Sequence, residues 1–229
     1  MRAMSFPRTN AEMEINGNQI AKVGNQKFAF RPDGFTLIEL LIVITIIAVL
    51  MGLLFPAFRG VQDQARKTQA KNDLAQIVTA VNSYYTEYGK YPLVTQGNDA
   101  AFKTDNSDVV NALRAVAIGA NASDALNPRK IVFFSPPDVK DSSNPRAGVT
   151  PTGFYYDPWG KNTANPEAGV YHIAMDGDYD NRMTNPYSAN AGSDPLRQGV
   201  IAWSLGADGS GGNGNKKTGA GTDDVISWQ

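Results

Sequence analysis

The sequence predicts an α+β fold, in which a long N-terminal helix packs on a small, mainly antiparallel sheet and a loop follows near the C-terminus. Three observations lead to this prediction. A strongly apolar run occupies 35–55, a helical period continues from it to residue 88, and the segments rich in β-branched and aromatic residues lie in the second half. Helix first and strands last, without an internal repeat, is typical of this fold class.

Composition bounds the function before any motif is considered. The chain has 229 residues, a formal net charge of −1, no cysteine and a single histidine. This length suits one domain, or one domain with an appendage, and the balanced charge gives no sign of nucleic-acid binding. Without cysteine no disulfide can hold the loops. The lone His172 falls in a predicted strand, so we interpret it as a strand residue rather than a zinc ligand or a base.

The apolar run is the first element of the predicted helix. Phe35–Phe55 has 21 residues and one charged side chain, Glu39. At 1.5 Å per residue it is about 30 Å long, which predicts a membrane span; a buried core helix is the alternative. A carboxylate inside a span is costly and is a candidate functional group. The alternative for Glu39 is a position at headgroup depth without a role.

The residues before the run predict proteolytic processing. They are polar and mildly basic, and a small residue, Gly34, stands before the apolar run. A secretory signal peptide has its small residues after the apolar stretch. The order found here predicts a cut on the cytoplasmic side, with the apolar segment retained in the mature protein.

The stretch from Gly34 to Glu39, GFTLIE, resembles the processing site of type IV pilins and type II secretion pseudopilins. The resemblance implies that prepilin peptidase cuts between Gly34 and Phe35 and methylates the new amine. It implies that Glu39 meets the N-terminal amine of a neighbouring subunit during assembly. It also implies a cytoplasmic leader at 1–34, a transmembrane half-helix at 35–55 and a periplasmic head at 56–229. Two departures from the family are the long leader and an acidic residue directly before Gly34.

One helix is predicted from about 35 to 88. Pro56 closes the apolar run and tends to kink the helix. Beyond it, apolar residues at spacings of three and four form one face that should pack on the sheet. These residues are Leu74, Ile77, Val78, Val81, Tyr84, Tyr85 and Tyr88. Gly89, with Pro92 just beyond, is the predicted stop.

The rest of the head is predicted to be one short helix and several strands. The helical pattern lies at 109–119, and strands are expected at 131–134, 153–157, 169–176 and 199–206. The strand expected at 153–157 ends in a turn marked by Pro158 and Gly160.

The glycine-rich segment at 206–224 is a candidate calcium loop. It contains Asp208, Asp223 and Asp224 and lies between Trp203 and Trp228. Carboxylate oxygens and glycine turns suit Ca²⁺, and a metal clip would replace the missing disulfide. A solvated flexible loop is the alternative.

The segments SLGADGSGG and DDVISW around this loop resemble the C-terminal signature of the major, G-type pseudopilin of type II secretion, whose loop binds calcium. YYDPWGK at 155–161 resembles a turn of the same family. Carried across, the resemblance implies backbone carbonyl ligands from Leu205 and Ser210, and carboxylate ligands from the three aspartates. The loop here is several residues longer, so the register of Ser210 and the choice between Asp223 and Asp224 remain open.

A second acidic group has Asp176, Asp178 and Asp180 at alternate positions, as at the start of an EF-hand loop. Asn181 and Tyr187 stand where that motif needs glycine and glutamate. We therefore expect a solvated turn, with a second calcium site as the alternative.

The resemblance implies a structural subunit of a periplasmic pseudopilus that drives protein export. Its expected partners are identical subunits, minor pseudopilins, the inner-membrane assembly platform, prepilin peptidase and membrane lipid, with no nucleic acid. The alternative is a surface type IV pilin for adhesion, motility or DNA uptake, against which the missing cysteines argue. An enzyme is not expected, since the sequence has neither a cysteine nucleophile nor a G-x-S-x-G elbow.

Overall fold

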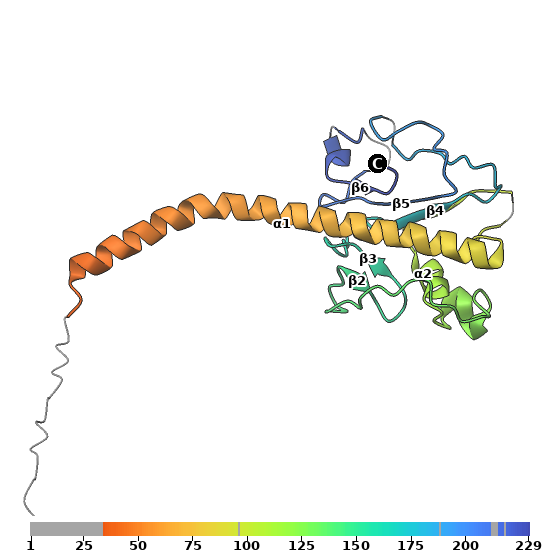
Figure 1. The fold of residues 1–229 in the computed structure, drawn as a ribbon, viewed down its shortest axis with the longest axis horizontal. Helices are drawn as coiled ribbons and strands as arrows, with labels where there is room; N and C mark the ends of the chain where they lie inside the picture. The colour runs from red at the N-terminus through yellow and green to blue at the C-terminus, as the bar shows by residue number, and fades with distance from the viewer. Residues whose placement is uncertain (1–33, 96, 188, 212–214, 218) are drawn as a thin grey trace, which may run out of the picture. The chain divides into compact units, whose positions relative to one another are not determined.

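The computed structural model describes residues 34–95, 97–187, 189–211, 215–217 and 219–229 (Figure 1). The predicted leader, apart from Gly34, lies outside the described residues. The chain divides into two units, Met1–Val49 and Leu50–Gln229. Helix α1 contributes residues to both units.

Helix α1 (Leu37–Tyr88) has 52 residues and confirms the helix predicted at 35–88. In the first unit its large apolar side chains are exposed, among them Leu37 at 88% and Ile38 at 65%. Among the described residues, no helix qualifies by length and hydropathy as a membrane span. The span predicted at 35–55 is therefore not confirmed.

The second half of α1 buries the predicted face. Leu74, Ile77, Val81 and Tyr84 are fully buried, at the spacings that bring residues to one side of a helix. The helix ends at the predicted glycine: Gly89 has a φ of +67° and donates its N–H to Tyr85 O at 2.7 Å.

The main sheet has the order β1-β4-β5-β6, and all its neighbouring strands are antiparallel, as predicted. Its strands are β1 (Ala100–Phe102), β4 (His172–Met175), β5 (Val200–Ser204) and β6 (Val225–Ile226). A second antiparallel pair consists of β2 (Gly148–Val149) and β3 (Tyr155–Tyr156). In the view of Figure 1, β4–β6 and the β2–β3 pair lie on opposite sides of the yellow part of α1.

Both faces of the main sheet are buried. Ile173 and Met175 belong to the cluster that contains the buried face of α1, whereas Ala174 belongs to a second cluster. The second cluster is closed by residues that follow β4 and precede β5, including Met183 and Leu196. Burial on both faces explains why β4 and β5 read as continuous apolar runs rather than as alternating ones.

The helix predicted at 109–119 is shorter than expected. Helix α2 covers Ser107–Leu113, and the short 3₁₀ segments η1 and η2 cover Gly119–Asp124 and Gly219–Thr222. Ala115 follows the end of α2 with a φ of +57°, a left-handed conformation that stops an α-helix.

The strand predicted at 131–134 is wrong. The side chain of Asn127 occupies both backbone groups of Ile131: its Oδ1 accepts the N–H at 3.1 Å, and its Nδ2 donates to the carbonyl at 2.7 Å. The N–H of Phe133 donates to Leu113 O. These backbone groups therefore bond to a side chain and to the end of a helix, and not to a neighbouring strand. Phe134 is nevertheless buried, as its apolar character requires.

Candidate functional site

The three aspartates of the glycine-rich segment converge. Asp208, Asp223 and Asp224 each offer a carboxylate oxygen within 4.8 Å of the others. Pairing of β5 with β6 causes this, because Trp203 lies opposite Ile226 and Ser204 opposite Val225. The residues that follow β5 and those that precede β6 are thereby held together, so the two ends of the loop meet.

Asp223 ties the end of the loop to its beginning. Its Oδ2 accepts the N–H groups of Ala207 and Asp208 at 2.5 and 3.0 Å. Gly206 makes this approach possible, since its φ is +66° and a Cβ there would lie 2.6 Å from Asp223 O. Asp208 in turn accepts the N–H of Ser210 through Oδ1 at 2.8 Å.

Asp224 has the most unusual environment of the three. It is only 4% exposed, and its Oδ2 accepts a hydrogen bond from the Tyr187 hydroxyl at 2.6 Å. Among the described residues its Oδ1 has no hydrogen-bond partner, although the atom is buried. Burial raises the pKa of Asp224 to about 7, and the nearby carboxylates of Asp223 and Asp208 add to this shift. The site thus contains a buried acceptor that needs a proton or a cation.

These residues fit the predicted calcium ion. The donors are hard oxygens, three carboxylates are held close together, and one buried oxygen has no hydrogen-bond partner among the described residues. Both Asp223 and Asp224 are in the group, so the structure brings together all the predicted carboxylate ligands. Ser210 lies beside Asp208, while the roles of the Leu205 and Ser210 carbonyls stay predictions.

The turn that resembles the pseudopilin family braces the start of this loop. Asp157 is fully buried; its Oδ1 accepts the N–H groups of Trp159 and Gly160, both at 2.9 Å. Its Oδ2 accepts the hydroxyl of Ser204, the last residue of β5, at 2.6 Å. Burial raises the pKa of Asp157 to about 6. The Asp157 carboxylate therefore links the turn after β3 to β5. Strand β5 leads into the glycine-rich segment at 206–224, which is called the aspartate loop from here on.

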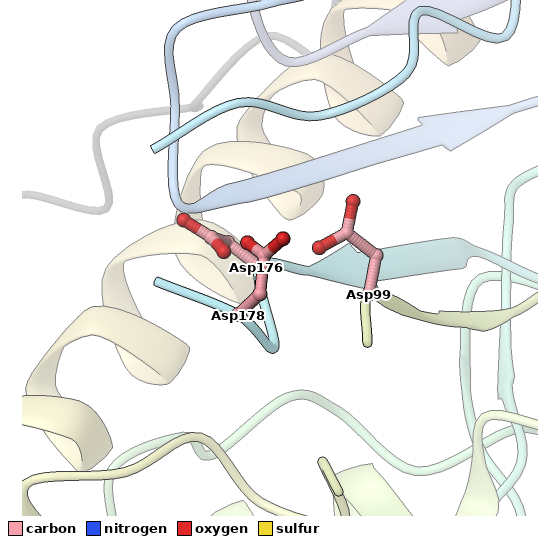
Figure 2. A group of neighbouring side chains, drawn as sticks. All are labelled: Asp99, Asp176 and Asp178. Atoms are coloured by element: carbon pink, nitrogen blue, oxygen red, sulfur yellow. The ribbon is translucent and has the colours of Figure 1, made fainter. Parts of the chain in front are cut away.

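The second acidic group differs from the prediction. Figure 2 shows Asp176 and Asp178 together with Asp99, and their carboxylates lie within 4.8 Å of one another. Asp180 is not in the group; its Oδ1 accepts the N–H of Arg182. Asp99 was missed because it lies 77 positions before Asp176 and is brought near by the pairing of β1 with β4.

The expected solvated turn is wrong for Asp176, which is 3% exposed. Its oxygens accept the N–H groups of Tyr179 and Asn181 at 2.6 and 2.7 Å. Both oxygens of the buried carboxylate are thus satisfied by the backbone, in contrast to Asp224.

Glu39 has a local hydrogen-bond partner, Thr36, three residues before it. Its Oε2 accepts the backbone N–H and the hydroxyl of Thr36 at 2.9 and 2.7 Å, and the Glu39 N–H donates to Thr36 Oγ1 at 3.2 Å. This reciprocal pair is a capping box at the start of α1, and its sequence signature is Thr-x-x-Glu. The structure does not test the predicted cut between Gly34 and Phe35.

His172 lies in β4, as predicted. It is 1% exposed, and its Nε2 is 2.7 Å from Glu167 O.

Comparison with known protein families gives two matches. Residues 31–55 match the prokaryotic N-terminal methylation motif, and residues 58–124 match type II secretion system protein G. These matches confirm the predicted resemblance for the N-terminal part of the chain. They end before the aspartate loop.

Curated relatives agree with these matches. The chain is 39% identical to type II secretion system core protein G of Pseudomonas aeruginosa over 71 residues, which is 31% of this chain and 50% of that protein. It is 38% identical to the core protein G of Escherichia coli (strain K12) over 28% of this chain and 44% of that protein.

A further relative is the type IV major pilin protein PilA of Myxococcus xanthus, with 38% identity over 28% of this chain and 30% of that protein. The chain spans about half the length of the core G proteins it matches. No solved structure gives a significant match.

Proposed function

We propose that this chain is a structural subunit of the periplasmic pseudopilus of a type II secretion system. The observation that carries the proposal is the order of the two family matches. The methylation motif at 31–55 runs directly into the protein G region at 58–124, and α1 is continuous through the junction.

In this proposal, prepilin peptidase cuts after Gly34, and Phe35 becomes the methylated first residue. The apolar half of α1 then anchors the subunit in the inner membrane, with the head in the periplasm. The sequence supports this, because 35–55 carries one charge. The described large apolar side chains between Phe35 and Leu54 are exposed, so they need lipid or other subunits to cover them.

Assembly would use the same half of α1. Identical subunits would pack through it into a helical filament, and the Glu39 carboxylate would pair with the amine of Phe35 on a neighbouring subunit. An ion pair would offset the desolvation of both charges in an apolar filament core. Minor pseudopilins and the inner-membrane assembly platform are the further partners of this proposal.

Calcium would stabilise the head of the subunit. Asp208, Asp223 and Asp224 would hold the ion, with the carbonyls of Leu205 and Ser210 as further ligands. The ion supplies a positive charge that clips the end of the loop to its beginning. The unsatisfied Asp224 Oδ1 supports this assignment.

A surface type IV pilin is the second candidate, favoured by the match to PilA of Myxococcus xanthus. Matches to core G proteins are more numerous among the relatives described, and a separate family match covers the protein G region.

Deletion of the gene in its source organism separates the two candidates. For a pseudopilin, the deletion is expected to leave normally exported enzymes in the periplasm and to keep surface pili intact. Expression of the wild-type chain should restore export. Normal export together with a loss of surface pili would reject the secretion role and favour the pilin.

A further inference from the structure

The excursion between β4 and β5 is described at 176–187 and 189–199, and these residues contact the C-terminal loop. Its Tyr187 and Leu196 share a buried cluster with Trp203, Leu205 and Ile226, which are residues of β5, of the loop start and of β6. The excursion therefore covers the outer face of the strands that bracket the aspartate loop.

Hydrogen bonds join the two segments in the middle of the loop and again beyond its C-terminal end. The N–H of Lys216 donates to Ala189 O at 3.0 Å, and Asn190 Nδ2 donates to Asn215 Oδ1 at 2.6 Å. Near the C-terminus, Trp228 Nε1 donates to Ala191 O at 2.6 Å. The excursion thus holds the middle of the C-terminal segment and its last tryptophan.

Within the excursion, Tyr187 makes a direct hydrogen bond to one of the three clustered aspartates, Asp224. Its ring is 3% exposed and packs near Trp228, with ring centroids 6.1 Å apart. Its N–H donates to Asn185 Oδ1 at 3.0 Å, so the backbone is held as well. The hydroxyl donates to Asp224 Oδ2 and leaves Asp224 Oδ1 as the buried oxygen without a partner among the described residues.

We propose that the excursion preorganises the calcium loop and that Tyr187 is a positioning residue for Asp224. The inference rests on the proposed calcium site. By occupying Oδ2, the hydroxyl fixes the rotation of the carboxylate and leaves Oδ1 to bind the ion together with Asp208 and Asp223. Hydrogen-bonded partners of metal-binding side chains act in this way, and their loss weakens metal binding by about 10- to 100-fold.

Calcium titration of Tyr187→Phe tests the proposal. The full chain in detergent is titrated with CaCl₂ by calorimetry at constant pH, after removal of metal with a chelator. We expect the Kd for calcium to rise at least about 10-fold relative to the wild type. Thermal melting without metal gives the cost of the lost hydrogen bond to the fold alone.

Tyr84→Phe is the matched control. Tyr84 is also buried, and its hydroxyl donates to Leu126 O at 2.6 Å. This variant loses the same atoms and should melt earlier, but its Kd for calcium should equal that of the wild type. If Tyr187 had a purely structural role, both variants would melt earlier and both would keep the wild-type Kd for calcium.

A second variant serves if Tyr187→Phe does not fold. Asn190 is exposed with a φ of +60°, which glycine adopts readily, so Asn190→Gly removes the bond to Asn215 without strain. We expect a Kd about 2- to 10-fold higher, which is the effect of losing one hydrogen bond.

The outcomes separate this inference from the proposed calcium site. An unchanged or lower Kd in Tyr187→Phe, with normal binding by the wild type, overturns the positioning role and leaves the site standing. If Tyr187→Phe does not fold, an unchanged Kd in Asn190→Gly overturns the preorganisation. Absence of calcium binding by the wild type overturns both.

Discussion

Replacement of Asp223 or Asp208 by alanine is expected to abolish a calcium-dependent rise in the melting temperature of this protein. An ion that binds only the folded state stabilises it by about 2.7 kcal/mol at 100 times its Kd. For a domain of this size that corresponds to a rise of roughly 5–10 °C in Tm. Each variant removes one of three converging carboxylates, and Asp223→Ala also frees the N–H groups of Ala207 and Asp208.

The measurement is thermal melting of wild type and variants with calcium and with chelator. Asp178→Ala is the control, because it removes an exposed carboxylate from the second acidic group. It should retain the full calcium-dependent rise. If Asp208→Ala and Asp223→Ala also retained it, the ion would not bind at the aspartate loop.

Substitution of Glu39 by glutamine is expected to leave processing intact and to prevent filament assembly. Glutamine can replace glutamate in a capping box, so the start of α1 should be preserved. The charge that would pair with the amine of a neighbouring subunit is lost. Filament assembly is measured by electron microscopy of cells that overproduce the subunit.

Thr36→Ala separates capping from pairing between subunits. It removes the hydroxyl of the capping box but keeps the Glu39 carboxylate. We expect this variant to form filaments. If Thr36→Ala stops assembly while Glu39→Gln permits it, Glu39 acts through the helix cap and the proposed ion pair is wrong.

The long helix and the sheet could be predicted because their signals are local. Spacings of three and four place Leu74, Ile77, Val81 and Tyr84 on one face, and the apolar runs that became β4 and β5 carry β-branched and aromatic residues. The prediction of a strand at 131–134 was wrong because the backbone there does not pair with a neighbouring strand. The side chain of Asn127 binds the backbone there, and apolar composition does not reveal such a partner.

The aspartate loop could be predicted only in part. Glycines and aspartates close together in sequence indicated Asp208, Asp223 and Asp224, and the resemblance strengthened that reading. Tyr187 could not be found, since it is 37 positions from Asp224 and tyrosine is most often a core residue. Asp99 could not be predicted either, because it is distant from Asp176 in sequence and only the β1–β4 register places the two close together.

The mass of the mature protein shows whether the chain is a prepilin-type subunit that is cut after Gly34 and retained through its N-terminal helix. Intact-mass spectrometry of the protein extracted from membranes of its source organism should find a chain that begins at Phe35 and carries one methyl group on its amine. A chain that keeps residues 1–34, or one that has lost the apolar segment at 35–55, would contradict it.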